Sequence, residues 1–308
     1  MFVIHNMIPR SGPGMLKRFF RKLRLLDFPI FPGLIIFLFI FTALFGEMLA
    51  PFPPSENNLP QKFIPPFFQA NGSWVHPLGT DMLGRDVLSR IMAGARPSLI
   101  VALVVIALAG LGGTALGIIS GYYGGKIDGL LMRVADSATA FPVILAAMLL
   151  AILLKPSMQN VVISITVIIW ARPARVIRGE VLSLRERDFI AQARVAGASG
   201  LRIMYHHIFP NIAPTMLVML TLQVGFVIIV EASLSFLGAG IPPPTPVWGS
   251  LISKGREYIT VAWWIPFFPG LALVLICLSF NMLGDWLREV LDPKLRQSGR
   301  VDSEFLGS

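Results

Sequence analysis

Long apolar stretches alternate with short polar ones along most of the chain. Apolar runs cover about 28–50, 98–120, 130–154, 158–177, 212–237 and 263–287. Each has roughly the 20 residues that an α-helix needs to cross a hydrocarbon core of about 30 Å. The pattern therefore predicts an all-α integral membrane protein with six transmembrane helices. Pro142 predicts a kink in the third, and Gly110, Gly113 and Gly117 predict close helix packing along the second.

The N-terminal segment has a different pattern. Residues 15–26 place Leu16, Phe19, Phe20 and Leu23 on one helical face, with lysines and arginines around it. This spacing predicts an amphipathic interfacial helix on an anionic membrane surface, within a cytoplasmic N-terminus at 1–28. A cleaved signal peptide is the alternative. The apolar run that follows is longer than the usual h-region of 7–15 residues, so we interpret it as an uncleaved first span.

Polar segments divide the rest of the chain. The first span and an extracytoplasmic excursion, which is rich in Pro and Gly, make up residues 29–96. In its last part Asp81, Arg85, Asp86 and Arg90 can pair locally around the start of a helix. A core of five spans follows at 97–292, with a second excursion at 238–262, and a polar tail closes the chain at 293–308.

Composition supports the membrane interpretation and gives it an orientation. Of 308 residues, 55% are hydrophobic and 14% are charged, with a mean hydropathy of +0.71. A soluble domain carries roughly 25% charged residues. The net charge of +9 could suggest nucleic acid. However, 19 of the 26 lysines and arginines lie in or beside polar segments that six spans would place on the same side of a membrane as the N-terminus. The positive-inside rule then favours a lipid bilayer over nucleic acid and predicts that both termini lie in the cytoplasm.

The segment 179–211 is the longest polar loop of the five-span core on the cytoplasmic side. Residues 186–211 read ERDFIAQARVAGASGLRIMYHHIFPN. The helical pattern breaks at Gly197, Ser199 and Gly200, so the loop predicts two short helices. Helices of about 10 residues are marginal in water, so we expect this pair to dock on another protein. Its many small residues would let that protein approach closely.

This loop resembles the EAA motif of ABC importer permeases, in which E-A-A precedes a glycine and then I-x-L-P. Here the matching places hold Ala191-Gln192-Ala193, then Gly197, then Pro210 at the end of HIFP. In that family the loop inserts into a cytoplasmic ATPase subunit. The resemblance implies that the following residues couple this chain to such a partner: Ala191, Gln192, Ala193, Arg194, Gly197, Ala198, Ser199, Leu201 and Pro210.

Three longer stretches extend the resemblance over nearly the whole chain. They read LGTDMLGRDVLSR from Leu78, EASLSFLGAGIPPPTPVWG from Glu231, and FPGLALVLICLSFNMLGDWLREVLDPKLR from Phe268. They are similar to permeases of the dipeptide/oligopeptide/nickel class, above all the dipeptide and oligopeptide "C" subunits. The resemblance implies a type I ABC importer for peptides. Its partners would be a sister permease, two ATPase subunits that bind ATP and Mg²⁺, and an external solute-binding protein. Nickel and glutathione-like cargo are alternatives.

The residues themselves indicate no catalytic chemistry and no cofactor. Gly124-Gly125-Lys126 is followed by Ile127, so it is not a phosphate-binding loop. The four histidines have no metal-ligand spacing. A non-catalytic subunit is therefore expected, with ATP hydrolysis on a partner. The rival from another class is an ion-coupled secondary transporter, which would need midplane carboxylates and paired broken helices.

Polar residues in the fifth span are candidates for the pathway or a gate. They are Gln223, Glu231 and Ser233. A charge within a span is costly, so Glu231 should face the bundle interior, a partner helix or water. Its alternative role is structural, as a hydrogen-bonding group that holds the fifth span to the loop after it.

Overall fold

The structure, a computed structural model, describes residues 29–291. Every regular element in this range is a helix. The amphipathic helix predicted at 15–26 and the polar tail at 293–308 lie outside the described residues.

Five helical stretches are long and apolar enough to cross a membrane. They are α2 (Ile30–Leu49); α3 (Val87–Val105) continued through a π-helical segment (Ile106–Leu111) into α4 (Gly112–Tyr123); α7 (Met158–Ile169) with α8 (Ala171–Arg185); α10 (Gly200–Ile203) continued through Met204–Ile208 into α11 (Phe209–Phe236); and α13 (Trp264–Leu291). The predicted all-α membrane fold is confirmed.

The third predicted span is not one helix with a kink. Its residues form α5 (Gly125–Thr139) and α6 (Val143–Leu153), which meet at an angle of 87°. Pro142 has an extended ψ of 126° and caps the start of α6, so it begins a new helix instead of bending an old one. The described residues reach six candidate spans only when this bent pair is counted as one.

The second span begins earlier than hydropathy predicted. The helix starts at Val87, whereas the sequence predicted a polar excursion to residue 96 and a span from residue 98. Asp86 caps this helix by accepting a hydrogen bond of 2.8 Å from the backbone N–H of Ser89. The sequence analysis placed the start of a helix among Asp81, Arg85, Asp86 and Arg90, but it kept this start inside the polar excursion. In the structure it is the start of the second span, and the polar Ser89 and Arg90 are buried by protein.

Other boundaries also differ from the predicted ones. The fifth span was predicted from residue 212, but its helix runs without a break from Gly200. The sixth runs to Leu291 instead of residue 287. The second excursion contains a short helix, α12 (Trp248–Arg256), that the sequence analysis did not predict. Its Trp248 is buried and donates a hydrogen bond of 2.9 Å to the backbone of Ile91 in α3.

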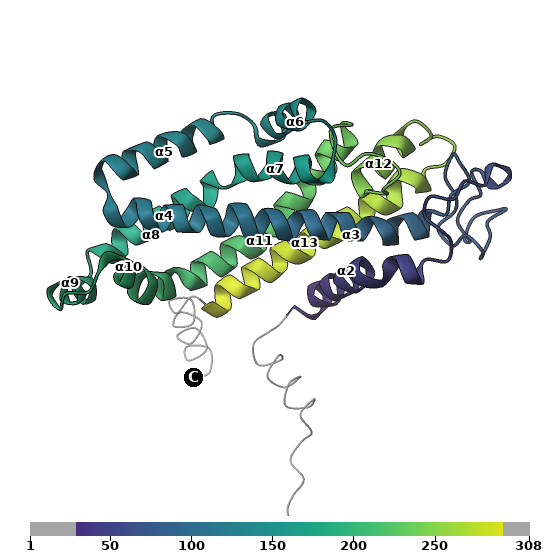
Figure 1. The fold of residues 1–308 in the computed structure, drawn as a ribbon. Coiled ribbons are helices and arrows are strands. Elements are labelled where there is room, and N and C mark those ends of the chain that lie inside the picture. Colours follow the sequence, from purple (N-terminus) through teal and green to yellow (C-terminus); the bar gives the residue numbers. More distant parts are fainter. Residues whose placement is uncertain (1–28, 292–308) are drawn as a thin grey trace, which may run out of the picture.

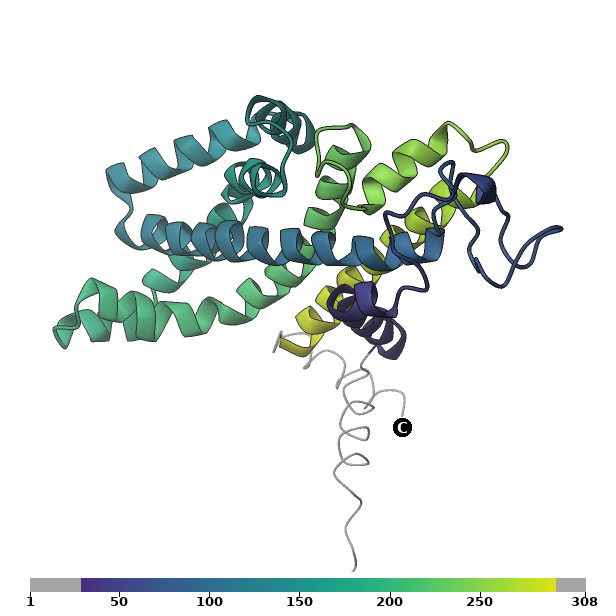
Figure 2. The same ribbon diagram turned by 45° about the vertical axis from the view of Figure 1, so that its right-hand side comes forward.

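The two polar regions lie at opposite ends of the molecule. Figures 1 and 2 both place the short helix α9 (Asp188–Val195) at one end, and α12 with the 50–86 segment at the other. We call these the α9 end and the α12 end. The long helices that connect them enclose a core shared by α2, α3, α7, α11 and α13.

Close packing of α4 on α8 fixes the α9 end. Cβ atoms placed on Gly113, Gly117 and Gly121 would lie 2.4–2.7 Å from Trp170, Ala174 and Val181. This confirms the predicted packing role of Gly113 and Gly117 and adds Gly121. Gly110 also packs closely, against Leu220 of α11.

Candidate coupling loop and transport cleft

The segment 186–205, which we call the α9 loop, lies at the α9 end. It is built around a residue that ends a helix, Gly197. Here φ is +78°, in the left-handed region that favours glycine. The backbone N–H of Ala198 donates to the carbonyl of Ala193, and that of Gly197 to the carbonyl of Arg194, each at 3.0 Å. This is the Schellman arrangement that ends helices. Ser199 then caps the next helix by accepting from Arg202 N–H at 3.4 Å.

The predicted break in the loop is thus confirmed, and a second helix does begin after it, but this helix continues into the fifth span without a second break. The helix that starts at Gly200 is the first part of the fifth span. On the other side of the loop, α8 ends at Arg185 and α9 begins at Asp188. The loop therefore joins two long helices almost directly, so displacement of α9 would act on both of them.

The loop is anchored to the helices beneath it. The side chain of Ile190 is fully buried in an apolar cluster with Ile118 of α4, Ile177 of α8 and Ile203 of α10. The guanidinium of Arg194 lies 5.6 Å from the centre of the Tyr122 ring, at the end of α4. These contacts give α9 a fixed position instead of leaving it as a free tether.

The outer surface of the loop carries apolar side chains that nothing in the described chain covers. Val195 is 90% exposed, Leu201 74% and Tyr205 70%. Of the residues predicted to couple to a partner, Ala193 and Ala198 are half-buried against the cluster below. The others at the α9 end are exposed: Ala191, Gln192, Arg194, Gly197, Ser199 and Leu201. Large apolar side chains exposed at a polar end of the molecule are typical of a protein-binding site.

Pro210 lies apart from this surface. It belongs to the first turn of α11 and lines an open cleft of about 990 Å³ between α8, α11 and α13. Apolar residues line much of the cleft, and its polar lining residues are Arg172, Glu180, Asn211, Thr215, Gln223, Asn281 and Arg288. Thr215 donates a hydrogen bond of 2.6 Å to Glu180, so α11 and α8 are linked across the cleft wall. A wall of this mixed character suits a passage for polar solutes.

Only one of the three predicted pathway residues lines this cleft. Gln223 does so, and its buried Nε2 has no hydrogen-bond partner among the described residues. Ser233 is not a lining residue, and its hydroxyl donates to the carbonyl of Ile229 in its own helix at 2.7 Å. Glu231 is fully buried away from the cleft.

Glu231 ties two spans together. Its carboxylate accepts hydrogen bonds from Ser98 of α3 at 3.2 Å and from Ser235, one turn along α11, at 2.8 Å. The predicted structural role named the loop after the fifth span as the partner, and that detail is wrong. The partner is the second span, which lies far away in sequence.

Replacing Glu231 with alanine is expected to destabilise the protein by about 2 kcal/mol, because two buried hydroxyl groups lose their acceptor and a cavity remains. Glu231→Gln keeps the size and one acceptor oxygen, so it should retain most of the stability. Thermal unfolding of the purified protein in detergent measures both changes. Normal stability of Glu231→Gln with complete loss of transport would instead indicate a pathway role.

A second link between elements was missed by the sequence analysis. Arg178 of α8 pairs with Asp128 of α5, with 2.6 Å between Nη2 and Oδ2. Ser120 of α4 donates to the same carboxylate at 2.5 Å. The pairing joins α4, α5 and α8 at the α9 end. Only the position of Asp128 beside a glycine-rich turn hinted at it, because the partner lies in a distant part of the sequence.

Comparison with known proteins identifies the family of this chain. Residues 113–297 match the family model for the binding-protein-dependent transport system inner membrane component. The dipeptide transport system permease protein DppC of Escherichia coli (strain K12) is 42% identical over 258 residues, which cover 84% of this chain and 86% of the relative. The di/tripeptide transport system permease protein DppC of Pseudomonas aeruginosa is 36% identical over 303 residues, covering 97% of this chain and 100% of the relative.

A third relative comes from another organism and is named for a broader cargo. A putative peptide transport system permease protein of Brucella abortus is 41% identical over 271 residues, which cover 87% of this chain and 88% of the relative. Both the matched family region and the near full-length similarity include the α9 loop and the helices of the cleft. This chain belongs to the family of binding-protein-dependent transport system inner membrane components, as a multi-pass protein of a bacterial inner membrane.

Proposed function

We propose that this chain is one of two permease subunits of an ATP-driven importer of peptides. A sister permease would close the open side of the cleft to form the pathway. Two cytoplasmic ATPase subunits would bind the α9 loops and hold ATP and Mg²⁺, and an external solute-binding protein would deliver the cargo. The chain itself would not be catalytic. The α9 end and both termini would then lie in the cytoplasm and the α12 end outside.

One observation carries the proposal: the loop with the exposed apolar surface joins α8 and α11, two of the three helices that line the cleft. Arg172 and Glu180 of α8 and Gln223 of α11 all face the cleft, and both helices run into the loop at their α9 ends. Movement of a bound ATPase would therefore be transmitted to the cleft walls through continuous helices. The hydrogen bond between Thr215 and Glu180 helps α8 and α11 to move together.

The cargo proposal rests on the names of the relatives. Those named for a substrate are dipeptide, di/tripeptide and peptide permeases, which favours peptides over nickel or glutathione-like molecules. The ion-coupled alternative would need midplane carboxylates and paired broken helices. Glu231 is enclosed by protein outside the cleft, Glu180 in the cleft accepts a hydrogen bond from Thr215, and the described residues hold one broken span, α5 with α6, instead of a pair.

Uptake by the reconstituted complex tests the proposal. The chain would be co-expressed with the permease and ATPase that purify with it, placed in proteoliposomes, and given the solute-binding protein with a labelled dipeptide. We expect uptake that requires ATP on the α9 side and the binding protein on the α12 side. Uptake driven by a proton or sodium gradient without ATP would contradict the proposal. Uptake of nickel chelates in place of peptides would contradict the cargo.

A further inference from the structure

A small pocket at the α12 end is separate from the transport cleft. Its volume is about 190 Å³, and its walls come from residues near Asn57, from the turn that leads into α3, and from α12. It shares no lining residue with the cleft. The space corresponds to about six water molecules at the volume each occupies in the liquid. That is enough for one acidic side chain and too little for an extended peptide.

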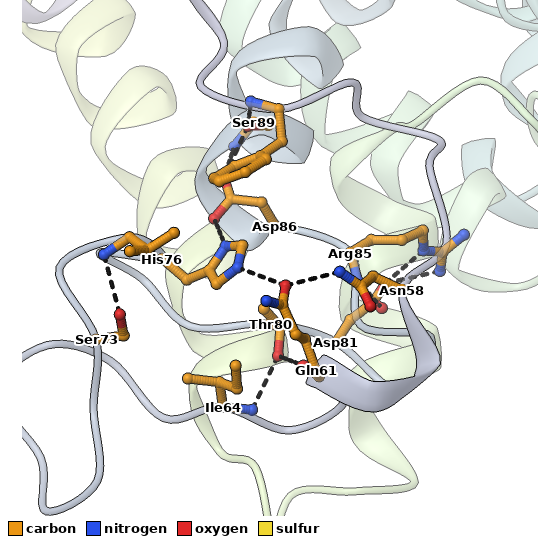
Figure 3. Close-up of polar contacts among 12 residues, drawn as sticks. Asn58, Gln61, Ile64, Ser73, His76, Thr80, Asp81, Arg85, Asp86 and Ser89 are labelled. Atoms are coloured by element: carbon orange, nitrogen blue, oxygen red, sulfur yellow. Dashed lines mark hydrogen bonds and ion pairs between the residues drawn. The ribbon is translucent and has the colours of Figure 1, made fainter.

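An internal network lies behind one wall of the pocket (Figure 3). Asn58, next to the lining residue Asn57, donates to Gln61 of this network at 2.9 Å. The ring of His76 bridges two acceptors, with Nδ1 3.0 Å from the Asp86 carboxylate and Nε2 3.0 Å from Gln61 Oε1. Thr80 links the same segment to the backbone of Ile64 and Gln61. The wall is therefore fixed before any partner arrives, which reduces the entropic cost of binding.

The lining of the pocket is strongly basic. Arg85, Arg90 and Lys254 all line it, and no Asp or Glu does so among the described residues. Asp81 lies behind this lining and pairs with Arg85 through an Nε–Oδ2 hydrogen bond of 2.8 Å. It also accepts from the backbone N–H groups of Leu83 and Arg85. The Asp81 carboxylate therefore balances only part of the charge of the three cations, and most of its hydrogen-bonding capacity is already used.

Arg90 is the buried member of this set. It is 3% exposed, and its Nη1 donates to the carbonyl of Pro54 at 2.7 Å. Its Nε makes no hydrogen bond among the described residues and lies 3.7 Å from Asp81 Oδ2. Because this Nε is closed to solvent, what Arg90 contributes to a ligand in the pocket is its positive charge. Burial, together with the charges of Arg85 and Arg90, also lowers the pKa of Lys254 despite an opposing effect from Asp81.

We propose that this pocket binds a carboxylate, supplied by an acidic side chain of the solute-binding protein when that protein docks. The inference rests on the proposed function, which places the α12 end outside and gives it this partner. Size and position argue against the cargo as the source, since the pocket holds one side chain and does not open into the cleft. The fixed cations would both speed the encounter and set the register of docking.

Affinity of the solute-binding protein for the complete transporter in nanodiscs tests the proposal. Lys254 is the residue to change, because it is half-buried and makes no structural hydrogen bond that the described residues reveal. We expect Lys254→Gln to weaken binding about tenfold and to flatten its dependence on salt, and Lys254→Arg to retain the affinity. Arg256→Gln is the matched control, because Arg256 lies on the same helix, is exposed, and stacks on Phe236 at 5.4 Å outside the pocket.

Each other outcome would overturn the proposal. Unchanged affinity in Lys254→Gln would exclude the pocket as a docking site, and an equal loss in Arg256→Gln would show only a general effect of positive charge. If Lys254→Gln leaves affinity intact but removes a preference for peptides with a free over an amidated C-terminus, the cargo occupies the pocket instead. Peptide uptake by the wild-type complex is measured in parallel. If the wild-type complex takes up peptide and Lys254→Gln binds the solute-binding protein normally, only this inference is contradicted. If the wild-type complex shows no ATP-dependent uptake, the proposed function is contradicted.

Discussion

Gly117→Leu is expected to destabilise the protein by about 3 kcal/mol or more, because the new side chain has no room between α4 and α8. A Cβ atom on Gly117 would already lie 2.5 Å from the carbonyl oxygen of Ala174 and 3.1 Å from Ile177. Backbone atoms cannot move aside as a flexible side chain can, so the two helices must separate. Thermal unfolding of the purified chain in detergent should show a decrease of about 6–12 °C in Tm, or no folded protein at all.

Gly112 provides the matched control for that substitution. It lies in the same helix, α4, and a Cβ atom placed on it meets nothing within 4 Å. Gly112→Leu changes helix propensity and apolar area in the same way as Gly117→Leu, but it should leave the Tm within a few degrees of the wild-type value. Equal destabilisation by both variants would mean that close approach of α4 and α8 does not hold the α9 end together.

Gly197→Trp is expected to reduce substrate-stimulated ATPase activity of the assembled transporter at least tenfold. The estimate assumes that the variant loses a well-packed interface contact worth about 1.4 kcal/mol or more, which corresponds to a factor of ten. Within this chain nothing lies within 4 Å of a Cβ atom at position 197, so the indole would meet no neighbour here. The clash would come from the ATPase. The chain should still insert, fold and bind its sister permease, since the changed residue is exposed at the loop surface.

The control for this experiment is Gly197→Ala. Because φ is +78° at this position, any side chain adds backbone strain of roughly 1–2 kcal/mol, which both variants share. Only tryptophan adds bulk. Coupling that is lost in Gly197→Trp and largely kept in Gly197→Ala therefore reports a partner on the loop surface. Normal stimulated activity in Gly197→Trp would show that no partner approaches there.

The sequence predicted the spans well because hydropathy and helix length together determine what can cross a membrane. All five long helices coincide with apolar runs, and the glycines at 113 and 117 indicated where two helices approach closely. The stop at Gly197 was also visible, since glycine followed by a serine cap is a local signal. These features depend on residues that are close together in the sequence.

The errors arose where polar residues are buried by other parts of the chain. The sequence analysis expected a helix start near Arg90 but assigned this residue and Ser89 to the excursion. Both side chains are buried against the 50–86 segment, where Phe52 N–H donates to Ser89 and Arg90 donates to the carbonyl of Pro54. Asp128 with Arg178, and Glu231 with Ser98, are pairs that only the tertiary structure brings together. The cleft has the same origin. Gln223 was a candidate, whereas Arg172 and Glu180 lie on α8 and Asn281 on α13, and only the fold brings these helices together around one cleft.

The central claim is that the α9 loop faces the cytoplasm and contacts an ATPase. One cysteine introduced at position 195 tests this claim most directly. Val195 is 90% exposed, and the native Cys277 is buried. In the intact transporter, Val195→Cys should resist a membrane-impermeant maleimide added from outside the cell. In inside-out vesicles, a short thiol-reactive cross-linker should join it to the ATPase subunit. Labelling from outside, or free labelling in inside-out vesicles with no cross-link to the assembled ATPase, would contradict the account.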